Sequence, residues 1–276
     1  MKVAVTGKGG VGKTTIAGTL ARLLGRDGLR ILAIDADPNY NLWSAIGMDD
    51  TIARRIQPLL ENEELVRQKT EMKWVEALGN FFQIHPSVND LAENFAVAGP
   101  DNVSLLVAGT VNMGGQGCMC PSAALLKALI NHLSLESNEA FIMDMDAGIE
   151  NLGRGTTCGM DALLAVVEPG RRSLDTLERI KGLAADIGLA RVFAVGNKVT
   201  DESDAAFISA ALKSYKIPLI GMVPFDETVR EADRHGIALI DLNENSPAVQ
   251  AIKAIKSELV RRLEELPSNT SLSEES

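Results

Sequence analysis

The sequence predicts an α/β fold: a single doubly wound, mostly parallel sheet with helices on both faces. Two observations lead to this expectation. Short, continuous apolar runs, typical of strands buried on both faces, alternate with helical patterns along most of the chain. A glycine-rich loop also joins the first apolar run directly to the first helical pattern. Regular alternation of this kind is typical of α/β proteins.

The expected elements follow one another in a regular order. We expect strands at 2–6, 31–35, 103–108, 141–144, 162–168, 191–195 and 219–222. We expect helices at 13–26 and near 121–135, 173–187, 203–215, 226–235 and 247–265. Residues 1–266 are therefore expected to form one domain.

Two segments interrupt this rhythm. Residues 48–100 show little periodicity and carry a charged stretch at 61–71. We expect an insertion there, built of short helices, that acts as a lid or partner surface. Residues 267–276 are polar and acidic, which predicts a disordered tail.

The composition excludes several classes of protein. The chain has 276 residues, 46% of them apolar, and no apolar run approaches the roughly 20 residues that span a bilayer. Its 27 basic and 37 acidic residues argue against nucleic-acid binding. Three cysteines do not make a disulfide framework, and the first residues predict a strand rather than a signal region. We therefore expect a cytoplasmic protein that binds neither membrane nor nucleic acid.

Residues 7–15 read GKGGVGKTT and form the expected phosphate loop. The glycine spacing, with Asp35 downstream, also suits a dinucleotide site, but a pyrophosphate there is held by backbone N–H groups. Lys13 and Thr14 decide between the two, because a triphosphate with Mg²⁺ needs a cation on its phosphates and a hydroxyl on the metal. The sequence thus predicts a site for a nucleoside triphosphate formed by Gly9, Gly10, Val11, Gly12, Lys13, Thr14 and Thr15.

The same string resembles the deviant Walker A motif of the MinD and nitrogenase-iron-protein group of P-loop ATPases. Lys8 is poorly placed to curl back to phosphates that its own loop encloses. The resemblance implies that Lys8 instead contacts the nucleotide of a facing subunit in a homodimer. It also implies that the chain binds ATP or ADP and hydrolyses ATP, with Lys8, Lys13 and Mg²⁺ neutralising charge.

Carboxylates follow two of the expected strands, where parallel strands face their ligands. The resemblance implies that Asp37 orients the attacking water. It implies that Asp144 holds Mg²⁺ through water while Thr14 supplies the hydroxyl. The role of Asp146 stays open.

The adenine pocket is expected at the ends of two later strands. An amide offers both a donor and an acceptor, which suits the edge of adenine, so Asn197 is the expected base reader. Lys198 follows it, and Pro224 and Phe225 would form the other wall of the pocket. These assignments rest mainly on the resemblance.

Cys118 and Cys120 flank Met119 after a glycine-rich stretch. Their spacing disfavours a mutual disulfide, and two thiols do not complete a tetrahedral site. One pair from each subunit of a dimer makes four sulfur ligands, which suit Zn²⁺ or Ni²⁺. The spacing alone is equally compatible with two small, half-buried residues. We expect Cys158 to be a packed residue.

Several motifs together resemble the CooC and AcsF type of nickel-insertion ATPase. They are GKGGVGKTT, DADP, the segment 58–70, CMC after the glycine-rich loop, and MDMDAGIENLGRGT. The resemblance implies an ATP-dependent metallochaperone that binds nickel at Cys118 and Cys120 between two subunits. Its client would be carbon monoxide dehydrogenase or acetyl-CoA synthase. Which client, and whether Ni²⁺ or Zn²⁺ is the native metal, stay open.

Two alternatives remain. A spatial organiser of the MinD or ParA kind would need a basic amphipathic C-terminal helix or a basic surface. The last expected helix carries basic residues but runs into Glu264, Glu265 and the acidic tail. The other alternative is an electron-donor ATPase with an iron–sulfur cluster between its subunits.

Overall fold

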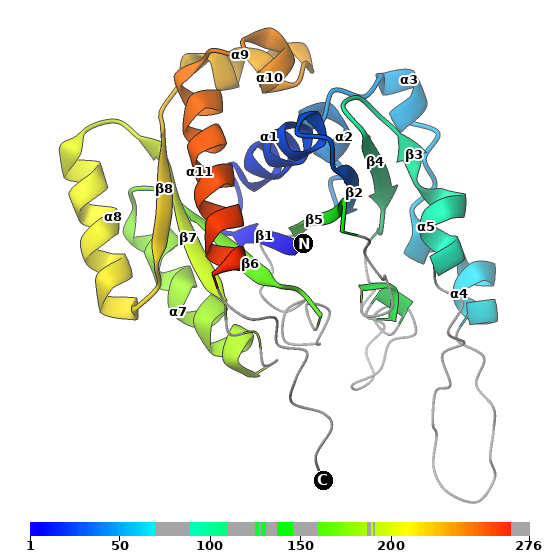
Figure 1. The fold of residues 1–276 in the computed structure, drawn as a ribbon, viewed down its shortest axis with the longest axis horizontal. Helices are drawn as coiled ribbons and strands as arrows, with labels where there is room; N and C mark the ends of the chain where they lie inside the picture. Colours follow the sequence, from blue (N-terminus) through cyan, green and yellow to red (C-terminus); the bar gives the residue numbers. More distant parts are fainter. Residues whose placement is uncertain are drawn as a thin grey trace, which may run out of the picture.

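The computed structural model describes residues 1–69, 89–109, 125–126, 128–130, 137–145, 159–186, 189 and 191–265. These residues form an eight-stranded sheet in the order β3-β4-β2-β5-β1-β6-β7-β8 (Figure 1). The strand pairs are parallel except for β3 with β4. The predicted fold class is therefore confirmed. The strands are β1 (Lys2–Gly7), β2 (Arg30–Ala36), β3 (Val97–Ala98), β4 (Val103–Val107), β5 (Glu139–Met145), β6 (Ala162–Val167), β7 (Val192–Val199) and β8 (Leu219–Pro224).

Helices cover both faces of the sheet (Figure 1). In chain order the helical segments are α1 (Lys13–Arg26), α2 (Leu42–Ala45), α3 (Asp50–Ala53), η1 (Leu59–Glu61), α4 (Glu63–Lys69), α5 (Asn89–Phe95), α7 (Arg171–Asp186), α8 (Glu202–Tyr215), α9 (Glu227–His235), α10 (Leu239–Leu242) and α11 (Pro247–Glu264). Of the helix expected near 121–135, residues 125–126 and 128–130 are described, and they are helical. No helix in the described ranges is long and apolar enough to cross a membrane.

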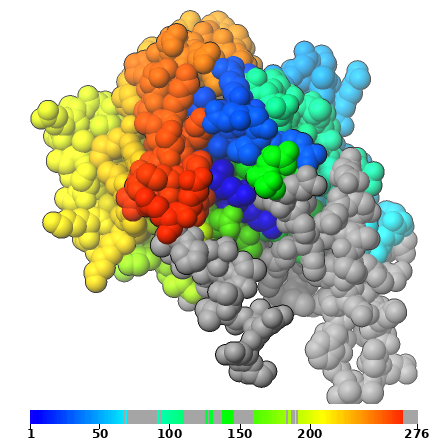
Figure 2. Space-filling view, in the orientation of Figure 1, coloured from blue at the N-terminus to red at the C-terminus, as the bar shows by residue number. Residues whose placement is uncertain are grey.

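Strand β1 shows why the apolar runs are continuous. Val3 and Val5 pack on the α1 and α11 side of the sheet, whereas Ala4 packs on the opposite side, and all three are fully buried. Because both faces are covered, the centre of the strand is a continuous apolar run rather than an alternation of apolar and polar residues. Helix α11 lies against α1, so the end of the described chain packs beside its beginning (Figure 2).

The segment 48–100 contains short helices, as predicted, in the part that is described. Residues 70–88 lie outside that part. Leu59, Leu60 and Leu91 are buried against the sheet, so the segment contributes to the core. The sequence did not predict β3, whose two residues are too few to show a period, nor the four-residue helices α2 and α10.

The register brings three loops to one edge of the sheet. Val5 of β1 and Asp35 of β2 both lie opposite Asp144 of β5, which runs between them. The loops that follow β1, β2 and β5 therefore leave the sheet side by side at its carboxyl edge, where doubly wound sheets bind their ligands.

Candidate functional site

The phosphate loop connects β1 to α1 and leaves the start of that helix open to a ligand. Gly12 occupies the N-cap position with φ 93°, and no described side chain caps the helix. A Cβ on Gly12 would lie 2.3 Å from Nδ2 of Asn197, so both the backbone angle and the packing require glycine. The N–H groups of the first turn are thus available to bind an anion.

Lys13, Thr14 and Asp144 form the polar floor of the site. The Lys13 side chain is buried, and the Thr14 hydroxyl donates a hydrogen bond of 2.6 Å to Oδ2 of Asp144. The pKa of Asp144 is raised to about 7, mainly by burial: the Thr14 hydrogen bond and Lys13 lower it, whereas Asp35 and Asp37 also raise it. A nearby cation would therefore stabilise the ionised carboxylate.

The same residues fit Mg²⁺. Oδ1 of Asp144 is buried and has no hydrogen-bond partner within the described ranges. A hydroxyl beside an unpartnered carboxylate oxygen supplies the oxygen donors that Mg²⁺ prefers. Thr14 and Asp144 would hold the ion, which supplies positive charge next to the triphosphate.

The loop after β2 is shaped by a second buried carboxylate. Asp35 is fully buried and accepts hydrogen bonds from the backbone N–H groups of Leu42 (2.9 Å) and Asp37 (3.1 Å). Burial raises the pKa of Asp35 to about 6, although these two hydrogen bonds lower it. Asp37 lines the cleft, and its Oδ1 accepts from both the backbone and the side-chain nitrogen of Asn39. Asp35 therefore sets the path of the loop that presents Asp37.

A cleft of about 660 Å³ opens in front of this floor. Its walls come from the phosphate loop, the Asp37 loop, α2, and the α9–α10 region. A smaller cavity of about 70 Å³ adjoins it, and Asn197, Lys198, Pro224 and Phe225 are among its lining residues. The structure thus brings together the residues that were expected to surround adenine in a small cavity, which adjoins a cleft of ordinary ligand size.

Asn197 and Lys198 also support the phosphate loop, a contact that the sequence analysis missed. Nδ2 of Asn197 donates to the carbonyl of Val11, and Nζ of Lys198 donates to the carbonyl of Gly10, each at 2.6 Å. Base reading by Asn197 remains a prediction.

Lys8 lies outside the cleft. Its side chain is 40% exposed and is not among the described residues that line the 660 Å³ volume. Its Nζ lies 3.9 Å from Oε1 of Glu168, whose other oxygen pairs with Lys198 at 3.1 Å. The sequence did not predict a role for Glu168, because its only distinguishing feature there is that it directly follows a buried strand. Contact of Lys8 with a partner's nucleotide remains a prediction.

The predicted sulfur site lies outside the described residues, which include none of Cys118, Cys120, Cys158 or Asp146. Within the described part of the chain, no three His, Cys, Asp or Glu residues are grouped as metal ligands. The nickel or zinc site therefore remains a prediction.

A phosphate loop that ends in Lys-Thr, with a buried carboxylate beside the threonine, defines a P-loop nucleoside triphosphatase. The family model for the CobQ/CobB/MinD/ParA nucleotide-binding domain matches residues 2–240, and the chain belongs to this family.

Relatives support the same class. The carbon monoxide dehydrogenase accessory protein CooC of Rhodospirillum rubrum is 43% identical over 245 residues, or 88% of this chain and 90% of that protein. An uncharacterized ATP-binding protein of Methanocaldococcus jannaschii is 38% identical, covering 95% of this chain and 98% of its own length. The chain is a P-loop ATPase, and membership of this class implies ATP or ADP with Mg²⁺ as its ligands.

Solved structures show the same fold. The cell division ATPase MinD of Pyrococcus furiosus has a TM-score of 0.69 at 22% identity, covering 95% of this chain and 98% of that one. A ParA family ATPase of Chlorobium tepidum has a TM-score of 0.67 at 17% identity, with 94% and 97% of the two chains covered.

Replacing Lys13 by Met should lower the rate of ATP hydrolysis at least about 100-fold, because the cation beside the phosphates is lost. The variant should still fold, since Lys13 is buried and forms no ion pair with the residues that the structure describes. Steady-state phosphate release measures the effect, with Lys213→Met on the exposed side of α8 as the matched control. A Lys13→Met protein within tenfold of the wild-type rate would contradict the assignment.

Replacing Asp35 by Asn should change how stability depends on pH. The raised pKa means that the folded protein favours protonated Asp35. The contribution of Asp35 to the free energy of unfolding is therefore full below about pH 4 and is lost as pH rises through about 6. The ligand-free wild type should lose roughly 3 kcal/mol more than Asp35→Asn between pH 4 and pH 8. Urea unfolding at both pH values measures this difference. If the free energy of unfolding changed equally with pH in the two proteins, the prediction that the pKa of Asp35 is raised would be wrong.

Proposed function

We propose that this P-loop ATPase is a metallochaperone that binds nickel between two subunits and delivers it to carbon monoxide dehydrogenase or acetyl-CoA synthase. Its similarity to CooC, named as an accessory protein of carbon monoxide dehydrogenase, carries the proposal. That relative covers most of the chain and favours carbon monoxide dehydrogenase as the client. In this account nickel is cargo, and Cys118 and Cys120 of each subunit are its ligands.

The described residues that lead toward the two cysteines support a link between nucleotide and metal. Ala108, just after β4, donates its N–H to the carbonyl of Asp35 at 2.8 Å. The chain that leads to Cys118 and Cys120 therefore starts at the same edge of the sheet as the Asp37 loop. A change in that loop on ATP binding would therefore act on the start of the segment that carries the two cysteines.

A contact between side chains reinforces this path. The Tyr40 hydroxyl, three residues after Asp37, donates to Glu61 of η1. A Cβ on Gly109 would lie 2.9 Å from Cβ of Pro58 and 3.6 Å from the Tyr40 hydroxyl. The Asp37 loop, the 48–100 insertion and the beginning of the cysteine loop thus meet at one junction, which suits an insertion that responds to nucleotide and faces the client.

Lys8 completes the proposed dimer. In the free chain its cation rests near Glu168 and stays partly exposed. An exposed pair of this kind is weak, so it can be exchanged for a triphosphate at modest cost. ATP would then bring two chains together, with each Lys8 on the other's nucleotide, and would place four thiols around one metal ion.

Replacing both Cys118 and Cys120 by Ser should abolish nickel binding, because the hydroxyl is a poor ligand for this ion. ATP hydrolysis should stay within about threefold of wild type, since the phosphate loop is untouched. Metal analysis of anaerobically loaded protein measures the first effect, with Cys158→Ser as the control. An unchanged amount of nickel per dimer in the double variant would refute the site.

Replacing Lys8 by Ala should separate nucleotide binding from dimer formation. The variant should bind ADP within about threefold of wild type, because Lys13 and the loop N–H groups remain. It should stay monomeric with ATP and Mg²⁺, since the cross-subunit charge contact is gone. Multi-angle light scattering measures the mass, with Lys213→Ala as control. A normal ATP-dependent dimer would disprove the role of Lys8 across the interface.

A further inference from the structure

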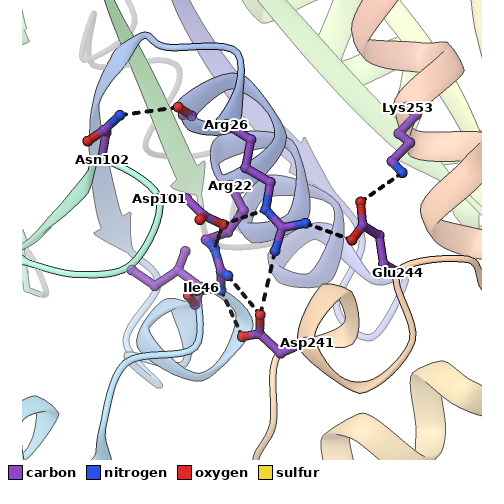
Figure 3. A network of polar contacts seen from close by, with 9 residues as sticks. Arg22, Arg26, Ile46, Asp101, Asn102, Asp241, Glu244 and Lys253 are labelled. Atoms are coloured by element: carbon purple, nitrogen blue, oxygen red, sulfur yellow. Dashed lines mark hydrogen bonds and ion pairs between the residues drawn. The ribbon is translucent and has the colours of Figure 1, made fainter.

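Arg22 lies on α1, about three turns from the phosphate loop. It is a buried cation, and all three of its guanidinium nitrogens donate hydrogen bonds (Figure 3). Its side chain is 3% exposed. Nη1 and Nη2 donate to the two oxygens of Asp241 at 2.9 and 2.7 Å. Nη1 also donates to the carbonyl of Ile46 at 2.7 Å, and Nε donates to Asp101 at 2.5 Å.

Two of these partners adjoin two different walls of the nucleotide cleft. Trp43, Ser44 and Ala45 of α2 line the cleft, and Ile46 is the next residue. Leu239 of α10 lines both the cleft and the smaller cavity, and Asp241 follows two residues later. Arg22 therefore ties the α2 wall to the α10 wall from behind, without lining the cleft itself.

The fit around Arg22 is close. Gly47 has φ 77°, and a Cβ there would lie 2.6 Å from Oδ2 of Asp241 and 2.8 Å from Nη1 of Arg22. A side chain at this position would push the two walls apart. The glycine therefore permits the approach of α2 and α10 that the guanidinium then fixes.

The contacts of Arg22 differ from those around it. A buried guanidinium that holds a carboxylate through two parallel hydrogen bonds is geometrically specific. The neighbouring pair of Arg26 with Glu244 (3.3 Å) and that of Lys253 with Glu244 (3.2 Å) are partly exposed, so each contributes little (Figure 3). The third partner of Arg22, Asp101, comes from the turn before β4 and touches neither wall.

We propose that the Arg22–Asp241 pair is a positioning element that sets the spacing of the α2 and α10 walls and thereby the affinity of the cleft for nucleotide. It acts on binding and leaves the chemical step alone, because the Lys13, Asp37 and Asp144 groups have no contact with it. This role depends on ATP binding and is independent of the nickel proposal.

Two isosteric variants of the full chain test the proposal. Asp241→Asn removes the charge that joins the walls, whereas Asp101→Asn removes a charge from the same guanidinium and leaves the walls joined. Asp101 has φ 53°, which Asn tolerates, so the control keeps its backbone. Calorimetric titration with Mg–ADP and ATP hydrolysis kinetics are measured on both, together with thermal unfolding.

We expect Asp241→Asn to weaken Mg–ADP binding about tenfold and to raise the KM for ATP equally, with kcat within about twofold. In Asp101→Asn the affinity for Mg–ADP, the KM for ATP and kcat should each stay within about twofold of wild type. Equal changes in the two variants, or a loss of thermal stability in both with unchanged ADP affinity, would overturn the proposal. If Asp241→Asn does not fold, Arg22→Lys takes its place: it keeps the charge but loses the bidentate contact, and normal ADP affinity in it would also overturn the proposal.

Discussion

The rest of the structure depends on a buried carboxylate at the end of a central strand. Asp144 lies at the carboxyl edge between β1 and β2, pressed against the Thr14 hydroxyl and near buried Lys13 and Asp35. An ionised carboxylate in such a place is costly unless a cation joins it. The loops around it are thus arranged for a ligand that brings positive charge with its phosphates, which is what Mg²⁺ with ATP supplies.

Each wall of the cleft is held by a contact that lies behind it. Asn197 and Lys198 hold the carbonyls of the phosphate loop, Asp35 holds the N–H groups of the Asp37 loop, and Arg22 holds α2 and α10 together. These contacts fix the loops and helices around the cleft before the nucleotide binds. A preorganised site of this kind loses less entropy when its ligand binds.

The fold and the phosphate site were predictable because their signals are local. A buried parallel strand needs a continuous apolar run, and a phosphate loop needs its glycines, lysine and threonine in one short string. The contact of Arg22 with Asp241 and the support that Asn197 gives to Val11 could not be predicted, because they join residues 219 and 186 positions apart. Glu168 could not be predicted either, because it follows the end of a strand that periodicity does not mark. Cys118 and Cys120 form a weak pattern whose meaning depends on a second chain, so the sequence indicates a site there only by resemblance.

We propose that nucleotide and nickel bind to one dimer and that the binding of each depends on the other. Anaerobic titration of Ni²⁺ into the protein with a non-hydrolysable ATP analogue, with ADP, or without nucleotide tests it most directly when mass and bound metal are read together. We expect one tightly bound nickel ion for two chains with the ATP analogue, and a monomer with little nickel when nucleotide is left out. A monomer that binds nickel equally tightly in all three conditions would contradict it.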